Sequence, residues 1–169
     1  IFDKIYQKKI IKKLNLIFNK NIDIIFDVGA HKGEFVKLII SNFNSKKIYS
    51  FEPSGTFNKL KENIKKMNLT ENQIHLNNFA LGEMDEKREF KQMKESSSST
   101  LSDIDTGSKY FKRKNLILNF GFNTKIFDKT VVRVKDGFTY LKEEKIEKVD
   151  LLKIDTEGYE YFVIKGFGK

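Results

Sequence analysis

The feature that most constrains this sequence is a short apolar run that turns through two glycines into an apolar helix. Ile24 to Val28 is too short for a helix and rich in β-branched residues, which is typical of a buried parallel strand. Gly29 and Gly33 follow, and a helical pattern begins at Glu34. Glycine lets a backbone approach a ligand closely, and a helix start offers free N–H groups. The sequence therefore predicts an α/β protein with a nucleotide site at this turn.

The residues within the turn distinguish two kinds of nucleotide. A dinucleotide fingerprint has three glycines, G-x-G-x-x-G, arranged around a pyrophosphate. Here Asp27 precedes the first glycine, and His31 occupies the position of the middle one. An acidic residue at the strand end repels a pyrophosphate and suits a cationic ligand such as a sulfonium or an amine. The turn therefore disfavours a dehydrogenase, although a glycine after a strand is often only a turn.

Strands and helices alternate along most of the remaining chain. Further strands are expected at 47–52, 74–81, 130–134 and 149–155, and helices at 34–40, 57–67, 138–142 and 157–166. Strands that alternate with helices imply right-handed crossovers and a mostly parallel sheet with flanking helices. Residues 1–21 form an N-terminal amphipathic helix, which we expect to pack on the domain rather than on a membrane.

A polar stretch interrupts this alternation. Lys87 to Met93 predicts an edge strand, Ser96 to Thr100 a polar loop, and residues 102–128 an irregular segment. We therefore expect one domain over residues 22–169, with an insertion or a pocket lid at about residues 83–128.

The composition excludes several kinds of site. The chain has no cysteine and only two histidines, so we expect no disulfide, no cysteine nucleophile, no thiolate metal site and no histidine-rich metal centre, and we assign no metal ligands. Its net charge of +9 favours an anionic partner such as RNA, but the lysines are scattered, which is more typical of solvated faces. The chain shows no signal peptide and no apolar run near the roughly 20 residues that cross a bilayer, which predicts a cytoplasmic protein.

Acidic residues follow two of the expected strands. Glu52 ends the second strand, about 20 residues after the glycine turn, where an acid accepts hydrogen bonds from ribose hydroxyls in nucleotide-binding βαβ units. The alternative is a surface acid before a turn. Asp155 and Glu157 follow the last strand, where they could bind a cation or remove a proton from a hydroxyl. Alternatively, Asp155 or Thr156 caps the next helix and Glu157 complements its dipole.

His31 is the remaining candidate for chemistry. Its place in the glycine turn suits either a catalytic base or a hydrogen bond to the loop backbone.

Four motifs together resemble the FkbM-type family of S-adenosylmethionine-dependent methyltransferases. They are Phe26–Gly33, Phe51–Pro53, Ala80–Gly82 and Asp150–Glu160. The resemblance covers residues 22–167, and its most specific part is the last motif, which contains a lysine, an aspartate and E-G-x-E. It implies a class I Rossmann-like fold, S-adenosyl-L-methionine as cofactor, and O-methylation of a hydroxyl on a sugar, glycan or natural product.

The resemblance also implies roles for particular residues. The cofactor loop would comprise Asp27, Gly29, Ala30, His31 and Gly33. Glu52 would hold the ribose hydroxyls, and Phe79 and Ala80 would lie beside the adenine. Asp155 and Glu157 would lie near the methyl group and the acceptor, as the first candidates for the base, and His31 would be the next candidate. The acceptor would be a small molecule or a glycan.

Two further inferences qualify this assignment. The resemblance to class I methyltransferases implies a seven-stranded sheet of order 3-2-1-4-5-7-6. The last strands of that sheet are not in this sequence, which predicts a C-terminally incomplete domain. The alternatives are an RNA methyltransferase, suggested by the charge, and a non-catalytic remnant that binds a cofactor or a partner. Methylation of base amino groups is disfavoured, because no proline follows Asp155.

Overall fold

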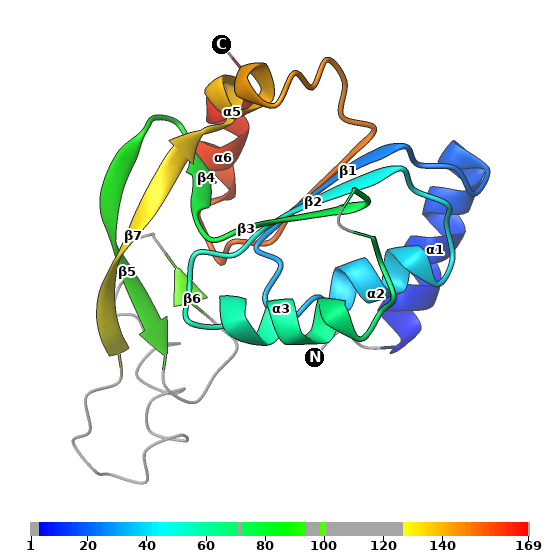
Figure 1. Cartoon of the computed structure of the whole chain (residues 1–169), viewed down its shortest axis with the longest axis horizontal. Coiled ribbons are helices and arrows are strands. Elements are labelled where there is room, and N and C mark those ends of the chain that lie inside the picture. Colours follow the sequence, from blue (N-terminus) through cyan, green and yellow to red (C-terminus); the bar gives the residue numbers. More distant parts are fainter. Residues whose placement is uncertain (1–3, 71, 94–98, 101–126, 169) are drawn as a thin grey trace, which may run out of the picture.

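The centre of the molecule is a parallel sheet of four strands (Figure 1). The computed structural model describes residues 4–70, 72–93, 99–100 and 127–168. The strand order is β3-β2-β1-β8. The strands are β1 (Ile24–Val28), β2 (Lys47–Phe51), β3 (Ile74–Asn77) and β8 (Leu151–Ile154). Val28 pairs with Phe51 on one side and with Ile154 on the other, so the carboxyl ends of these strands meet at one edge.

Helices cover both faces of this sheet, which confirms the predicted α/β architecture (Figure 1). The helices are α1 (Lys4–Phe18), α2 (Glu34–Ile40), α3 (Phe57–Lys65), α5 (Gly137–Glu143) and α6 (Glu160–Phe167). Side chains alternate between the two faces, as they must in a strand. Ile25 and Ile48 pack in a cluster with α1, α2 and α3, whereas Phe26 and Tyr49 pack in a cluster with α5 and α6.

A second, mostly antiparallel sheet has the order β4-β7-β5-β6. Its strands are β4 (Ala80–Gly82), β5 (Glu86–Met93), β6 (Ser99–Thr100) and β7 (Phe127–Asp136). The predicted polar loop at 96–100 is therefore wrong at its end, because Ser99 and Thr100 pair with β5. Residues 102–126 of the predicted insertion lie outside the described residues, and Phe127 and Asp128 belong to β7 rather than to an irregular segment.

Two predicted elements have different limits in the structure. The strand expected at 74–81 is two strands in two sheets, because the chain turns at Asn78, whose amide Nδ2 donates to the Glu52 carbonyl oxygen at 2.9 Å. Helix α6 begins at Glu160 rather than Glu157. Glu157 and Gly158 have φ values of +54° and +105°, which a right-handed helix does not accommodate.

Among the helices that the structure describes, none has the length and apolar character needed to cross a membrane.

Candidate functional site

The candidate site is a cavity of about 310 Å³ at the carboxyl ends of β1, β2 and β8. This is near the lower end of the range for small-molecule pockets. The predicted site residues that line the cavity are Gly29, Ala30, His31, Glu52, Ala80, Asp155 and Glu157. Asp27, Gly33 and Phe79 are not among its lining residues. The structure thus brings together residues from four separate motifs, as expected where parallel strands end at one edge.

The glycine turn is held by contacts within the chain. Gly29 has a φ of +76°, and a Cβ atom there would lie 2.0 Å from the Asp155 carbonyl oxygen. The amides of Gly29 and Ala30 both donate to the Phe51 carbonyl oxygen at 3.0 Å. Gly29 therefore allows the β1 and β8 ends to approach each other, and these two amide groups already have partners inside the protein. The glycine turn can therefore contribute a close backbone approach to a ligand, but the Gly29 and Ala30 amides are not free hydrogen-bond donors.

Glu52 is a buried carboxylate with a defined orientation. Glu52 is only 6% exposed to solvent, so the alternative that it is a surface acid is wrong. One carboxylate oxygen accepts from the His31 amide at 2.7 Å, and the other accepts from the Ser54 amide at 3.0 Å. Glu52 therefore ties the end of β2 to the glycine turn while it lines the cavity. Each oxygen keeps a lone pair for a ligand hydroxyl.

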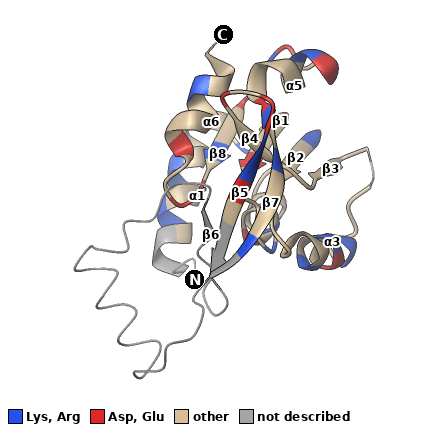
Figure 2. Cartoon of the chain, turned by 90° about the vertical axis from the view of Figure 1, so that its left-hand side faces the viewer, with Lys and Arg blue, Asp and Glu red and all other residues tan. Residues whose placement is uncertain are grey.

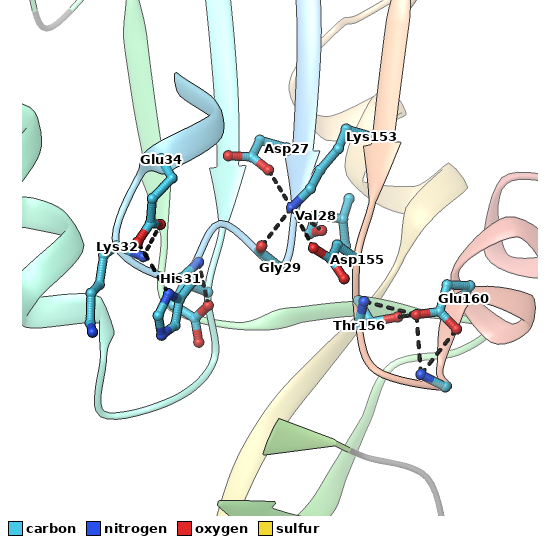
Figure 3. Close-up of polar contacts among 12 residues, drawn as sticks. Asp27, Val28, Gly29, His31, Lys32, Glu34, Lys153, Asp155, Thr156 and Glu160 are labelled. Atoms are coloured by element: carbon cyan, nitrogen blue, oxygen red, sulfur yellow. Dashed lines mark hydrogen bonds and ion pairs between the residues drawn. The ribbon is translucent and has the colours of Figure 1, made fainter. Parts of the chain in front are cut away.

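Asp27 lies behind the cavity and contacts it through a lysine (Figure 3). Its carboxylate is fully buried, and Lys153 Nζ lies 3.0 Å from its Oδ1 atom. The same ammonium group donates to the Gly29 carbonyl oxygen at 2.7 Å and lines the cavity. Burial raises the pKa of Asp27, and the nearby positive charge of Lys153 opposes this shift. Asp27 therefore shapes the glycine turn indirectly, through Lys153.

Lys153 is a site residue that the motif analysis left without a role. Its signal in the sequence is a cation inside an otherwise apolar strand, at Leu151-Leu152-Lys153-Ile154. The Lys153 side chain is only 14% exposed, so its charge requires a partner, and Asp27 lies directly opposite it in the β1–β8 register. The pairing of these two positions could not be seen until the strand order was known.

The two carboxylates after β8 both line the cavity, but they differ in surroundings. The Asp155 side chain is 54% exposed, and its Oδ2 atom lies 3.9 Å from Lys153 Nζ. Glu157 sits in a left-handed backbone conformation on an exposed turn. Neither Asp155 nor Thr156 caps α6, whose N-cap residue is Tyr159 without a side-chain cap. The capping interpretation of these residues is therefore wrong.

His31 lines the cavity from the glycine turn (Figure 3). Its backbone is left-handed, with a φ of +50°, and its Nδ1 atom lies 3.6 Å from a Glu34 carboxylate oxygen. The imidazole is 30% exposed. The imidazole therefore lies near the first residue of α2 and also has access to the cavity, so His31 stays a candidate proton carrier.

The apolar wall of the cavity includes three residues to which the motif analysis assigned no role. Leu81 and Phe90 contribute from the second sheet, and Tyr159 from the start of α6. Phe79 instead packs against Phe51 and Tyr140, with ring centroids 5.8 Å apart in both pairs. Leu81 and Tyr159 lie within two of the motifs and Phe90 lies outside them, but only the folded chain identifies all three as wall residues.

Gly33, the second glycine of the turn, has a structural explanation. Gly33 lies under α3, where an added Cβ would meet Leu60 at 3.0 Å, so it serves helix packing rather than the cavity wall. Within the described part of the chain, no group of three or more potential metal ligands could hold a metal ion.

The fold and the cavity together define a class of protein. The sheet order reverses direction between β1 and β8, and open α/β sheets bind ligands at such a switch point, outside the carboxyl ends of the strands. The domain is therefore of the Rossmann-like type, with its candidate ligand site at this edge.

Comparison with known proteins then gives the family. The model of the methyltransferase FkbM domain matches residues 27–169, so the chain belongs to the FkbM methyltransferase family. A crystal structure of methyltransferase FkbM from Methylobacillus flagellatus KT has a similar fold, with a TM-score of 0.52 and 14% sequence identity. The similarity covers 86% of this chain and 28% of that one, so this chain spans well under half the length of the other. No curated protein matches the sequence.

Proposed function

We propose that this domain transfers a methyl group from S-adenosyl-L-methionine to a hydroxyl group of a sugar, glycan or natural product. The observation that carries the proposal is the buried carboxylate of Glu52, held by two backbone amides at the switch point of a domain in a methyltransferase family. A fixed carboxylate at this position suits the two hydroxyls of a ribose. The carboxylates that line the other side of the cavity suit the positive charge of a sulfonium.

The chain's own residues divide into a cofactor half and an acceptor half. We assign Gly29, Ala30 and Glu52 to the cofactor half, with Ala80 and the neighbouring apolar wall beside the adenine. Asp27 and Gly33 support this half through Lys153 and α3, respectively. Asp155 and Glu157 form the acceptor half, because they line the cavity from the turn after β8.

Methyl transfer to a hydroxyl group mainly requires that the protein align the two reactants and supply a base. When bound, S-adenosyl-L-methionine supplies an already activated methyl group. The protein must hold the acceptor oxygen in line with it, and alignment of this kind contributes a large share of catalysis. A positioned base that takes the hydroxyl proton typically contributes about 10²- to 10⁴-fold in rate. We assign this role to Asp155 or Glu157, with His31 as the next candidate at the same cavity.

Calorimetric titration with S-adenosylhomocysteine and with NAD tests the proposal. We expect S-adenosylhomocysteine to bind and NAD not to bind. The Glu52→Ala variant should lose about 1.5–3 kcal/mol of binding free energy, the range for hydrogen bonds to a charged group. The Glu62→Gln variant, at an exposed position on α3, serves as a control and should bind normally.

Glu52 also holds the turn, so loss of affinity alone does not prove a ribose contact. The 2′-deoxy analogue of S-adenosylhomocysteine separates the two effects. The wild type should bind the analogue more weakly than the parent compound, and Glu52→Ala should bind the two alike. If the variant still discriminates as well as the wild type, Glu52 is not the ribose ligand.

A further inference from the structure

The last glutamate of the E-G-x-E motif lies beside the cavity wall and makes a cluster of hydrogen bonds (Figure 3). Glu160 Oε1 accepts from the Thr156 amide at 2.9 Å and from the Thr156 hydroxyl at 3.1 Å. The Gly158 amide donates to both carboxylate oxygens, at 3.1 and 3.0 Å. One side chain thus closes the turn over residues 156–158.

This turn has a backbone that requires support. Glu157, between the two residues that Glu160 holds, has a φ of +54°, and Gly158 has a φ of +105°. A left-handed conformation is unfavourable for a residue with a side chain, because the Cβ atom comes too close to the following carbonyl oxygen. The hydrogen bonds from both neighbours of Glu157 to a single carboxylate offset this cost, because bonds to a charged acceptor are stronger than neutral ones.

The charge state of Glu160 agrees with this arrangement. Burial by itself would raise the pKa of Glu160, but hydrogen bonds from its own amide and from those of Gly158 and Thr156 outweigh it and lower the pKa. The carboxylate is therefore ionised, as a strong acceptor must be.

We propose that Glu160 is a positioning residue that fixes the turn carrying Asp155 and Glu157, and so sets the direction in which both carboxylates face the cavity. Asp155 immediately precedes the held residue Thr156, and Glu157 lies between the two held amides. The geometry of the turn stands on its own, whereas its consequence for ligand binding rests on the proposed function.

A competing role is stabilisation of helix α6. Glu160 lies in the first turn of that helix, where a negative charge interacts favourably with the helix dipole. A dipole effect would act on the helix as a whole. A positioning effect would act on the amides of Thr156 and Gly158 and on ligands in the cavity.

The experiment compares Glu160→Gln with the wild type by amide hydrogen exchange and by titration with S-adenosyl-L-methionine. The carboxamide has nearly the same volume, but its NH₂ group cannot accept from the Gly158 amide at the Oε2 position, and its oxygen is an uncharged and weaker acceptor for the Thr156 amide. We expect the amides of Thr156 and Gly158 to exchange about tenfold faster, corresponding to about 1.4 kcal/mol. Affinity for S-adenosyl-L-methionine should fall about three- to tenfold, because its sulfonium charge would face Asp155 and Glu157, and the amide of Val163, within α6, should exchange as before. The Glu62→Gln variant provides the same chemical change on an exposed helix as a control.

Each other outcome overturns a defined part of the inference. Unchanged exchange at Thr156 and Gly158 would show that Glu160 does not hold the turn. Equally faster exchange at Val163 would assign Glu160 to helix stability instead. A looser turn with wild-type affinity would remove the positioning role. If the wild type itself does not bind S-adenosyl-L-methionine, the proposed function fails, and the exchange data still decide whether Glu160 holds the turn.

Discussion

At the scale of single residues, Lys153 connects the interior of the domain with its cavity. Its ammonium group lies between the fully buried carboxylate of Asp27 and the carbonyl oxygen of Gly29 (Figure 3). The lysine is itself only 14% exposed, so water does little to screen the pair. Removing one partner of a buried ion pair leaves the other charge without compensation, which typically costs more than the pair contributes.

Lys153→Met should therefore destabilise the domain by about 3–5 kcal/mol, measured by urea unfolding at neutral pH. The double variant Lys153→Met/Asp27→Asn should lose less, because no buried charge remains unpaired. If the double variant is as unstable as the sum of both single variants, the two residues do not act as a pair.

The same variant gives a pH dependence with a definite sign. The pKa of Asp27 is raised in the folded state, so the folded protein binds its proton more tightly than the unfolded chain. Stability from this residue is present below the ordinary pKa of 3.8 and is lost as pH rises through the folded-state pKa. Lys153 opposes the shift, so Lys153→Met should lose stability more steeply than the wild type above about pH 4. The Asp27→Asn background should abolish this difference.

At the scale of elements, α1 shows how one helix divides its residues between the core and the surface. Ile11, Leu14 and Phe18 pack against the cluster formed with α2 and α3. Leu16 and Ile17, in contrast, are 80% and 71% exposed. The sequence predicts an amphipathic helix over residues 1–21, but α1 carries more apolar residues than its packed face can bury.

Leu14→Ala should lower the free energy of unfolding by about 1–2 kcal/mol, less than for a fully buried leucine because Leu14 is only partly buried. Leu16→Ala is the matched control on the same helix and should change stability by no more than about 0.5 kcal/mol. Thermal or urea unfolding distinguishes the two variants. Equal effects would mean that α1 does not pack on the domain as this structure shows.

At the scale of the whole molecule, the two sheets share one core. Phe26 and Phe51 of the parallel sheet belong to the same buried cluster as Val132 and Val134 of the second sheet. Helix α6 joins the sheets, because Gly166 approaches β4 so closely that a Cβ there would lie 1.9 Å from the Gly82 carbonyl oxygen. Basic side chains are spread over helices and over β5 and β7, with acidic side chains among them (Figure 2).

Gly166→Ala should therefore separate α6 from β4 and destabilise the domain by about 3 kcal/mol, because a backbone carbonyl cannot move aside as a flexible side chain can. Affinity for S-adenosylhomocysteine should fall as well, since α6 and β4 both contribute to the cavity wall through Tyr159 and Ala80. Gly168→Ala is the control, because its added Cβ would come no closer than 3.6 Å to another atom. Equal stability of the two variants would show that α6 tolerates a shift away from β4.

Much of this architecture could be predicted because its signals are local. The apolar run at 24–28, the two glycines and the following helix lie within one short stretch, and Glu52 follows a strand that is recognisable from its own residues. Parallel strands end at one edge, so the meeting of Gly29, Glu52 and Asp155 followed from the order of strands and helices alone.

The sequence by itself therefore determined the α/β class, the glycine turn and the acidic residues at the strand ends, because periodicity and turn chemistry act between near neighbours. Only the tertiary structure decided that Lys153 pairs with Asp27, that Phe90 and Tyr159 form the cavity wall, and that Glu160 closes the turn after β8. The first two join residues far apart in the chain, and no local pattern encodes such contacts. The last is local, but it depends on left-handed backbone angles at Glu157 that its residue type does not predict.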